Sequence, residues 1–187
     1  YGGSTTVSDG VLRYGAVDAV PTGSALTLLE GALLDITLGG AAVTLGSIAS
    51  NGPTQGGVIV STATSGTTIF TAGGDNSSTD FGGVIVNGAG STLEFVKTGT
   101  GTLTFGGANQ YNGSTTVADG RLVAKAVGGG SPLGTSQSLI MGGATTSGIL
   151  QLGDSAALLN HTFTSFSSQG TGTANQVVSG NASMATL

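Results

Sequence analysis

Residues 95–125 read FVKTGTGTLTFGGANQYNGSTTVADGRLVAK, and this stretch decides the fold. It holds two alternating runs, TLTF at 102–105 and STTV at 114–117, with a third run around Leu122. A period of two places the apolar residues on one side of a strand and the threonines on the other. The Asn-Gly and Asp-Gly pairs between the runs tolerate positive φ and let the chain turn sharply. The stretch therefore predicts short strands joined by tight corners. Four side chains are expected inside: Leu103, Phe105, Val117 and Leu122.

Part of this stretch occurs twice. Residues 1–13 (YGGSTTVSDGVLR) align without a gap with 111–123 (YNGSTTVADGRLV), and nine of the 13 positions are identical. A shorter echo, GGVIV, occurs at 56–60 and again at 82–86. Repetition on a scale of ~20–30 residues indicates a solenoid. We expect the two STTV runs to lie on the same side of that solenoid, a whole number of coils apart, about five coils of ~22 residues.

The composition favours a folded, all-β chain. Glycine makes up 36 of the 187 residues, far above its usual ~7%, and only 7% of residues are charged. The hydrophobic share of 38% is higher than that of a disordered chain. Val, Ile and Leu occur in short runs between turn residues, as they do in β proteins. We therefore expect an all-β parallel β-helix.

The charge, hydropathy and cysteine content argue against several kinds of partner and site. The net charge is −5, and the four bases (Arg13, Lys97, Arg121 and Lys125) are scattered. Binding to nucleic acid or to an anionic membrane surface needs clustered Lys and Arg, so we expect neither. No apolar run approaches the ~20 residues that span a bilayer. The absence of cysteine excludes disulfides and thiolate metal sites.

Strand-like runs continue along the whole chain, so we expect one continuous solenoid over 1–187. The leucines of 26–38 have partly helical spacing, but Gly31 and the alternation of Leu34, Ile36 and Leu38 favour strands. Coils of about 20–26 residues would give roughly eight coils and a rod of roughly 40 Å. The chain begins within a repeat, so we expect it to continue into further repeats of a longer protein. Loops are expected at 21–24, 49–55, 72–80 and 128–137, and the last strands at 139–141, 149–152, 162–166 and 176–178.

The central stretch resembles the autotransporter-associated β-strand repeat, also called the passenger-associated transport repeat. The resemblance rests on KTG at 97–99, GTLTF at 101–105, GANQYNG at 107–113, TTV at 115–117 and GRL at 120–122. The phenylalanine that ends GTLTF stands where the family usually has leucine. The resemblance implies a right-handed parallel β-helix in large exported bacterial surface proteins. It supplies no catalytic residues.

Residues that could carry chemistry have simpler explanations. His161 is the only histidine, and no Gly-x-Ser-x-Gly motif frames a serine beside it, so we interpret it as a surface or corner residue. The acid pair Asp75 and Asp80 is interpreted as two solvated residues of a polar loop. Asp9 and Asp119 each precede a glycine and are interpreted as turn residues. We therefore predict no catalytic, cofactor-binding or metal-binding residue.

Three further patterns are weak. Gly73-Gly74-Asp75 is isolated, whereas calcium-binding nonapeptides occur in tandem. Gly99-Thr100-Gly101 is followed by no helix-forming stretch and so is no phosphate loop. Tyr1 and Tyr111 recur at one repeat position and are interpreted as corner-packing residues rather than as a glycan-stacking surface. Sequons at four asparagines matter only in a host that glycosylates them: Asn76, Asn112, Asn160 and Asn181.

These observations leave three functional hypotheses. The first is a non-enzymatic stalk or filament segment on a bacterial cell surface, a stiff spacer in which further repeats or identical subunits stack end to end. The second is an adhesin module whose loops contact a host or glycan ligand. The third is a carbohydrate-active β-helix enzyme. Glycan binding would favour the second hypothesis, and turnover of polysaccharides the third.

Overall fold

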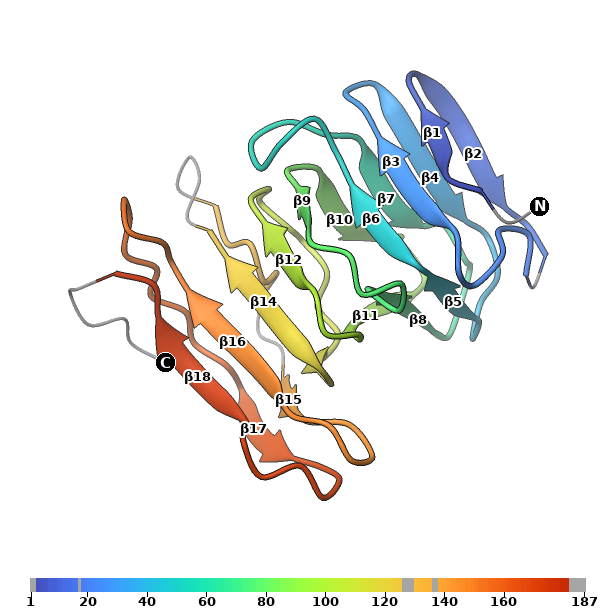
Figure 1. Cartoon of the computed structure of the whole chain (residues 1–187). Coiled ribbons are helices and arrows are strands. Elements are labelled where there is room, and N and C mark those ends of the chain that lie inside the picture. The colour runs from blue at the N-terminus through green and yellow to red at the C-terminus, as the bar shows by residue number, and fades with distance from the viewer. Residues whose placement is uncertain (1–2, 17, 126–129, 136–137, 182–187) are drawn as a thin grey trace.

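The computed structural model describes residues 3–16, 18–125, 130–135 and 138–181, and within them the regular elements are all strands (Figure 1). The strands form four parallel sheets. Sheet A contains β1 (Thr5–Val7), β3 (Ala25–Leu28) and β6 (Ser47–Ala49). Sheet B contains β2 (Gly10–Tyr14), β4 (Ala32–Ile36), β7 (Val58–Ser61) and β10 (Val84–Asn87). Sheet C contains β5 (Ala42–Leu45), β8 (Thr67–Ala72), β11 (Thr92–Lys97), β13 (Thr115–Val117), β15 (Ser138–Met141) and β17 (Ser165–Ser168). Sheet D contains β9 (Thr79–Phe81), β12 (Thr102–Phe105), β14 (Gly120–Ala124), β16 (Gly148–Leu152) and β18 (Gln176–Ser179).

The chain visits the sheets in turn, which makes a β-solenoid of about seven turns. Strand β6 lies against β9, where the Ser50 amide donates to the Asp80 carbonyl at 2.9 Å. Sheets A and D therefore follow one another along one side of the solenoid, while B and C form the other two sides. The all-β parallel solenoid is confirmed. It has about seven turns rather than eight because several coils, such as the one from Leu122 to its partner Leu150, are longer than the sequence analysis assumes.

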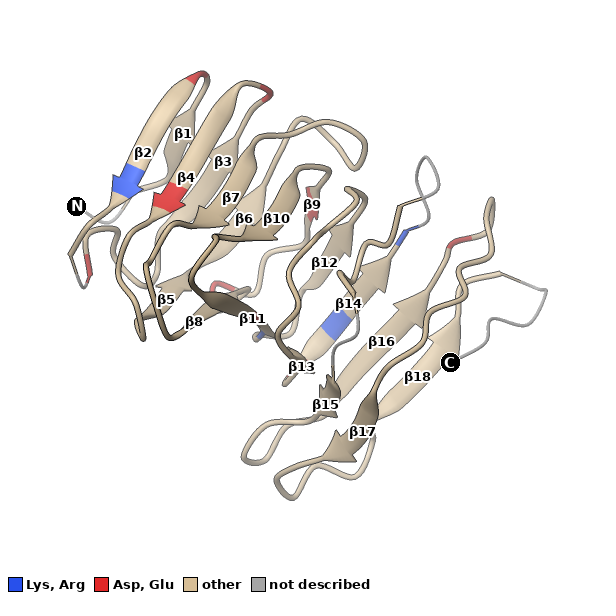
Figure 2. Cartoon of the chain, turned by 180° about the vertical axis from the view of Figure 1, so that it is seen from behind, with Lys and Arg blue, Asp and Glu red and all other residues tan. Residues whose placement is uncertain are grey.

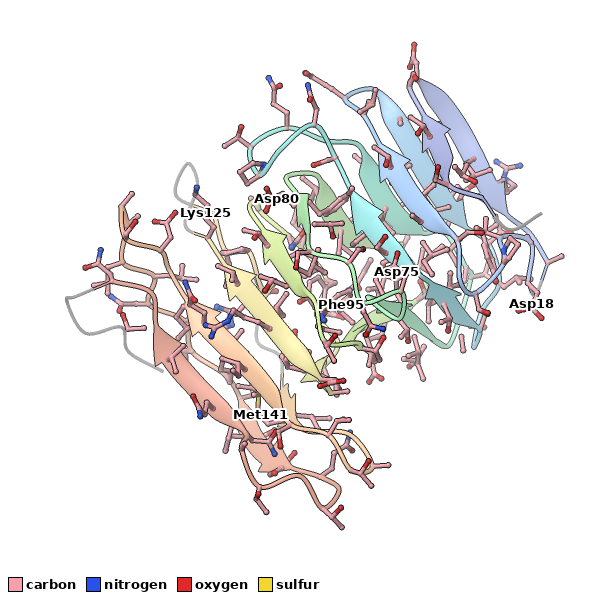
Figure 3. All side chains as sticks on the ribbon, in the orientation of Figure 1. Asp18, Asp75, Asp80, Phe95, Lys125 and Met141 are labelled. Carbon is pink, nitrogen blue, oxygen red and sulfur yellow. The ribbon has the colours of Figure 1, made fainter. Side chains whose placement is uncertain are left out.

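The interior is a stack of apolar side chains in register. Phe70 pairs with Phe95 in sheet C, and Phe81 pairs with Phe105 in sheet D. The rings of Phe95 and Phe105 meet across the core with centroids 4.7 Å apart, and all four rings are fully buried. Figure 3 shows Phe95 among the interior side chains. The predicted burial is confirmed for each of the four residues: Leu103, Phe105, Val117 and Leu122.

The short echo GGVIV marks equivalent positions one coil apart. Val58 pairs with Val84 and Ile59 with Ile85 in sheet B, and both isoleucines are fully buried. The flanking valines face outward and stack strand on strand, and such β-branched cross-strand pairs stabilise a sheet. The distance between the two copies is therefore one coil of the solenoid.

The two copies of the longer repeat, residues 1–13 and 111–123, lie on different sides of the solenoid. The prediction that they share one side is wrong. The first STTV run forms β1 in sheet A, whereas the second forms β13 in sheet C. What the copies share is a corner: the Asp9 carboxylate accepts from the Gly10 amide at 2.7 Å, and Asp119 accepts from Gly120 at 2.8 Å. Both glycines have positive φ, 82° and 63°. The motif encodes a local strand–corner–strand unit that can stand at any edge of the coil.

Unequal coil length explains the mismatch. The coil that starts at Leu103 closes when Leu122 pairs with it, whereas the next coil closes only when Leu150 pairs with Leu122 and is much longer. Because such differences accumulate along the chain, the spacing between the two motif copies need not equal a whole number of coils.

Several predicted bounds also need correction. Strand β6 includes Ala49, and β9 includes Thr79 and Asp80, residues that we placed in loops. The run expected at 162–166 instead forms β17. Part of the loop expected at 128–137 lies outside the described residues.

Candidate functional site

Lys97, the last residue of β11, is buried in the corner that joins sheets C and D. Its Nζ donates to the carbonyl oxygens of Thr98 at 2.5 Å, Gly99 at 2.8 Å and Asp119 at 3.3 Å. The first two carbonyls belong to the corner of its own coil, and the third belongs to the corner of the next coil. The ammonium therefore ties two successive corners together by satisfying carbonyls that point into the stack.

Burial lowers the pKa of Lys97 from 10.5 to about 8, while the Asp119 and Asp75 charges act in the opposite direction. The unfolded chain thus holds this proton more tightly than the folded chain between pH 8 and 10.5. In that window the unfolded state binds more protons, so the free energy of unfolding must rise with pH.

We expect the free energy of unfolding to increase by up to about 3 kcal/mol as the pH rises through this window. The measurement is urea denaturation at a series of pH values. Toward its upper end the trend will bend down, because burial strongly raises the pKa of Tyr111 and the unfolded chain loses the phenol proton first. In Lys97→Met the rise should be absent. A wild-type profile that is flat or falls across the window would contradict the buried ammonium.

Asn109 lies on the sheet B side of the solenoid, beyond the last strand of that sheet, and its side chain makes the hydrogen bonds that a further strand would make. After β10, sheet B has no further strand among the described residues, and the isolated bridge between Val86 and Gln110 continues its ladder. There the Asn109 side chain, 3% exposed, accepts from the Ile85 amide at 2.7 Å and donates to the Pro132 carbonyl at 2.6 Å. One side-chain amide therefore connects three successive coils where the backbone forms no regular sheet.

Tyr111 fills the same coil from the inside. It is fully buried, and its hydroxyl lies 2.8 Å from the Thr115 hydroxyl. Burial next to a single hydroxyl partner raises the pKa of the phenol, so the ring stays neutral. Tyr111 is a packing residue, as interpreted; Tyr1 lies outside the described residues.

The glycines of the motif allow the coils to approach. A Cβ at Gly107 would lie 1.8 Å from the Gly83 carbonyl oxygen, and a Cβ at Gly101 would lie 2.1 Å from that of Ser77. No side chain fits at these separations, so backbone lies directly on backbone. The motif of residues 97–122 is therefore a packing motif.

His161, interpreted as a surface or corner residue, is buried with 8% exposed, so the surface alternative is wrong. Its Nδ1 lies 3.2 Å from the Ser131 hydroxyl, and its ring packs against Phe163 with centroids 4.4 Å apart. Burial lowers the pKa of His161. The imidazole is therefore neutral at pH 7 and serves as part of the packed interior.

The acid pairs do not come together. Asp9 and Asp119 lie at corners between different sheets, β1 to β2 and β13 to β14. Figure 3 shows Asp75 and Asp80 well apart. The Asp75 carboxylate accepts from the Ser77 amide at 2.9 Å and from its hydroxyl at 2.6 Å, which closes a tight turn. The Gly-Gly-Asp pattern thus belongs to a turn.

The other patterns also have structural roles. Gly99 has a positive φ of 68° at the corner that Lys97 occupies. The side-chain oxygen of Asn76 accepts from the Thr100 amide at 2.9 Å, which joins two coils. Asn112 is exposed.

An open groove that the sequence did not predict lies on the outer side of β9 and β12. Its volume is about 310 Å³, and five residues line it: Ser78, Thr79, Asp80, Thr102 and Thr104. The alternation in TLTF marks the outward threonines, but their neighbours across the sheet come from a segment read as a loop. The described residues contain no group of three or more His, Cys, Asp or Glu that could hold a metal ion, and no helix that could cross a membrane.

Charges are sparse over the rest of the surface (Figure 2). Two ion pairs join successive coils in the described chain: Arg13 to Asp35 at 3.0 Å, and Lys125 to Asp154 at 3.1 Å. In the first pair Arg13 is exposed and Asp35 is buried, and in the second pair both side chains are partly buried. Pairs that remain open to solvent on one side contribute little, roughly 0–1 kcal/mol each. These two ion pairs add little to the stability of the stacked coils, and they do not form a charged binding surface.

Comparison with known proteins agrees with the resemblance seen in the sequence. Residues 95–124 match the model of the passenger-associated-transport-repeat family. Neither a search of curated proteins nor a search of solved structures returned a match. The family match coincides with the coil that Lys97, Asn109 and Tyr111 hold together.

Proposed function

We propose that this chain, a β-solenoid that carries a passenger-associated transport repeat at residues 95–124, is a rigid, non-catalytic spacer in an exported protein of the bacterial cell surface. The repeat is one of autotransporter passengers, which suggests a surface or extracellular location. The observation that carries the proposal is that the polar and aromatic residues of the repeat serve to hold the coils together. Its Lys, Asn and Tyr all face inward and join neighbouring coils or pack between them.

A solenoid is suited to this role because its contacts are local. Each coil binds only its neighbours through backbone ladders, so stability is approximately a sum over coil interfaces. Length can then change by whole coils without rebuilding a core. Stiffness follows from the continuous sheets, in which sheets C and D run without a break from β5 to β17 and from β9 to β18.

The echo GGVIV offers a direct test of modularity. Deleting residues 58–83 joins Gly57 to Val84 and restores the sequence GGVIV at the junction. Strands β7, β8 and β9 are removed, and β10 can pair with β4 in the register that β7 uses. We expect the full-length protein to fold, to reach the cell surface and to lose about 4.8 Å of length. Antibody labelling and protease accessibility on intact cells measure the display.

A matched control is deletion of residues 58–70, which removes half a coil and directs the following strands to the wrong sides. This variant should fail to fold and to be displayed. If the whole-coil deletion loses display as completely as the half-coil deletion, the modular spacer proposal is wrong.

The adhesin hypothesis remains the second candidate. The groove over β9 and β12 supports it, because a concave polar surface is suited to a ligand rather than to a purely mechanical role.

A further inference from the structure

The groove over β9 and β12 has a definite chemical character. Ser78, Thr102 and Thr104 contribute hydroxyl groups, and Asp80 contributes a carboxylate. Thr79 also lines the groove, but it pairs with the inward-facing Leu103, so its hydroxyl is not counted among the outward groups. None of these five residues is a cation, a large apolar residue or an aromatic. An anionic ligand would meet the Asp80 charge without a compensating base, and an apolar ligand would bury hydroxyls without partners. The lining is suited to a ligand that is itself rich in hydroxyl groups.

The polar groups are spaced along a regular lattice. Thr104 pairs with Asp80 on the neighbouring strand, so their outward side chains stand about 4.8 Å apart. Thr102 lies two residues before Thr104, about 6.6 Å along the same strand and on the same face. A carboxylate accepts two hydrogen bonds at once, and a hydroxyl both donates and accepts. Vicinal hydroxyls on a sugar ring can use both kinds of partner.

One wall of the groove is held in place by the next coil. The Thr102 amide donates to the Ser78 hydroxyl at 3.0 Å, which leaves the proton of Ser78 free to be donated. The Asn76 side chain fixes the same loop to Thr100, and the Asp75 turn closes it. A loop ordered before binding loses less conformational entropy when a ligand arrives.

We propose that this groove binds a neutral saccharide, one or two sugar units of a glycan, through Asp80 and the surrounding hydroxyls. A volume of about 310 Å³ is at the lower end of the range for small-ligand sites. The proposal goes beyond the spacer function and is independent of it. Within the adhesin hypothesis it names one ligand class, neutral saccharides, and one location, the strand face where the end of the loop expected at 72–80 meets β12.

The test uses the whole chain, residues 1–187, and a panel of neutral disaccharides: lactose, maltose, cellobiose and N-acetyllactosamine. Amide chemical shifts are followed by nuclear magnetic resonance as each sugar is titrated to millimolar concentrations. We expect at least one sugar to move the amides of residues 78–80 and 102–104. Asp80→Asn and the double variant Thr102→Val, Thr104→Val should each weaken binding about tenfold.

Matched controls remove the same groups elsewhere. Glu94→Gln removes a carboxylate from β11, and Thr67→Val removes an exposed hydroxyl from β8 on another side of the solenoid. Both should bind as the wild type does. The proposal is overturned if no sugar shifts the groove amides, if the shifts lie elsewhere, or if Asp80→Asn binds as tightly as the wild type. It is also overturned if calcium alone produces the shifts.

The coil deletion separates the two proposals. Removing residues 58–83 takes away the Ser78–Asp80 wall, so this variant should be displayed but should bind no sugar. If the deletion variant is displayed but binds no sugar, both proposals are supported. If the deletion variant is not displayed while the wild-type chain binds sugar, only the spacer proposal is contradicted.

Discussion

Replacing Phe105 with Asp is expected to unfold the central coils. The Phe105 ring is fully buried between Phe95, 4.7 Å away, and Phe81, 6.4 Å away. Aspartate would lose these contacts, leave a cavity and place a carboxylate in an apolar stack with no base beside it. We expect a loss of about 4 kcal/mol or more in the free energy of unfolding. Thermal and urea denaturation followed by circular dichroism measure it.

Phe105→Leu is the matched control, because leucine is the residue that the family usually has at this position. Because both side chains are apolar, Phe105→Leu should lower the free energy of unfolding by less than about 1.5 kcal/mol. A Phe105→Asp protein that melts with the wild type would show that the inward face of β12 has been assigned wrongly.

Asn109→Ala is expected to have the second largest effect. Alanine would leave the Ile85 amide and the Pro132 carbonyl unsatisfied inside the stack, since the Asn109 side chain serves both. Each buried unsatisfied group costs about 1–3 kcal/mol, so the expected loss for the two groups is about 2–6 kcal/mol. Amide hydrogen exchange should also speed up at Ile85, which reports on the coil directly.

The neighbouring residue provides the control. Gln110 is exposed and joins Val86 through its backbone, so Gln110→Ala should change stability by less than about 0.5 kcal/mol. Equal losses in the two variants would mean that the Asn109 amide does not connect the coils.

Much of the fold could be predicted because its rules are local. The alternation in TLTF determines which side chains face inward, and the Asp-Gly pairs determine where the chain turns. Both rules act within a few residues, so the corners at Gly10 and Gly120 form alike although they lie between different sheets. The two GGVIV copies form neighbouring strands, because they are a single coil apart.

The candidate site was less accessible to this reasoning. No local pattern distinguishes Lys97 from a solvated lysine, because one of its three carbonyl partners, Asp119, belongs to the next coil. The groove likewise joins 78–80 with 102–104, which only the pairing of β9 with β12 brings together.

By itself, therefore, the sequence determined the strands, the corners and the inward face of each run, since these depend on short-range sterics and burial. Only the tertiary structure decided on which side of the coil each repeat lies, which ammonium is buried and where the surface is hollowed. The physical reason is that the coils differ in length, as the short coil from Leu103 to Leu122 and the long one from Leu122 to Leu150 show. Small differences in loop length add up along the stack, and the position of each strand is settled only when its backbone pairs with the coil below.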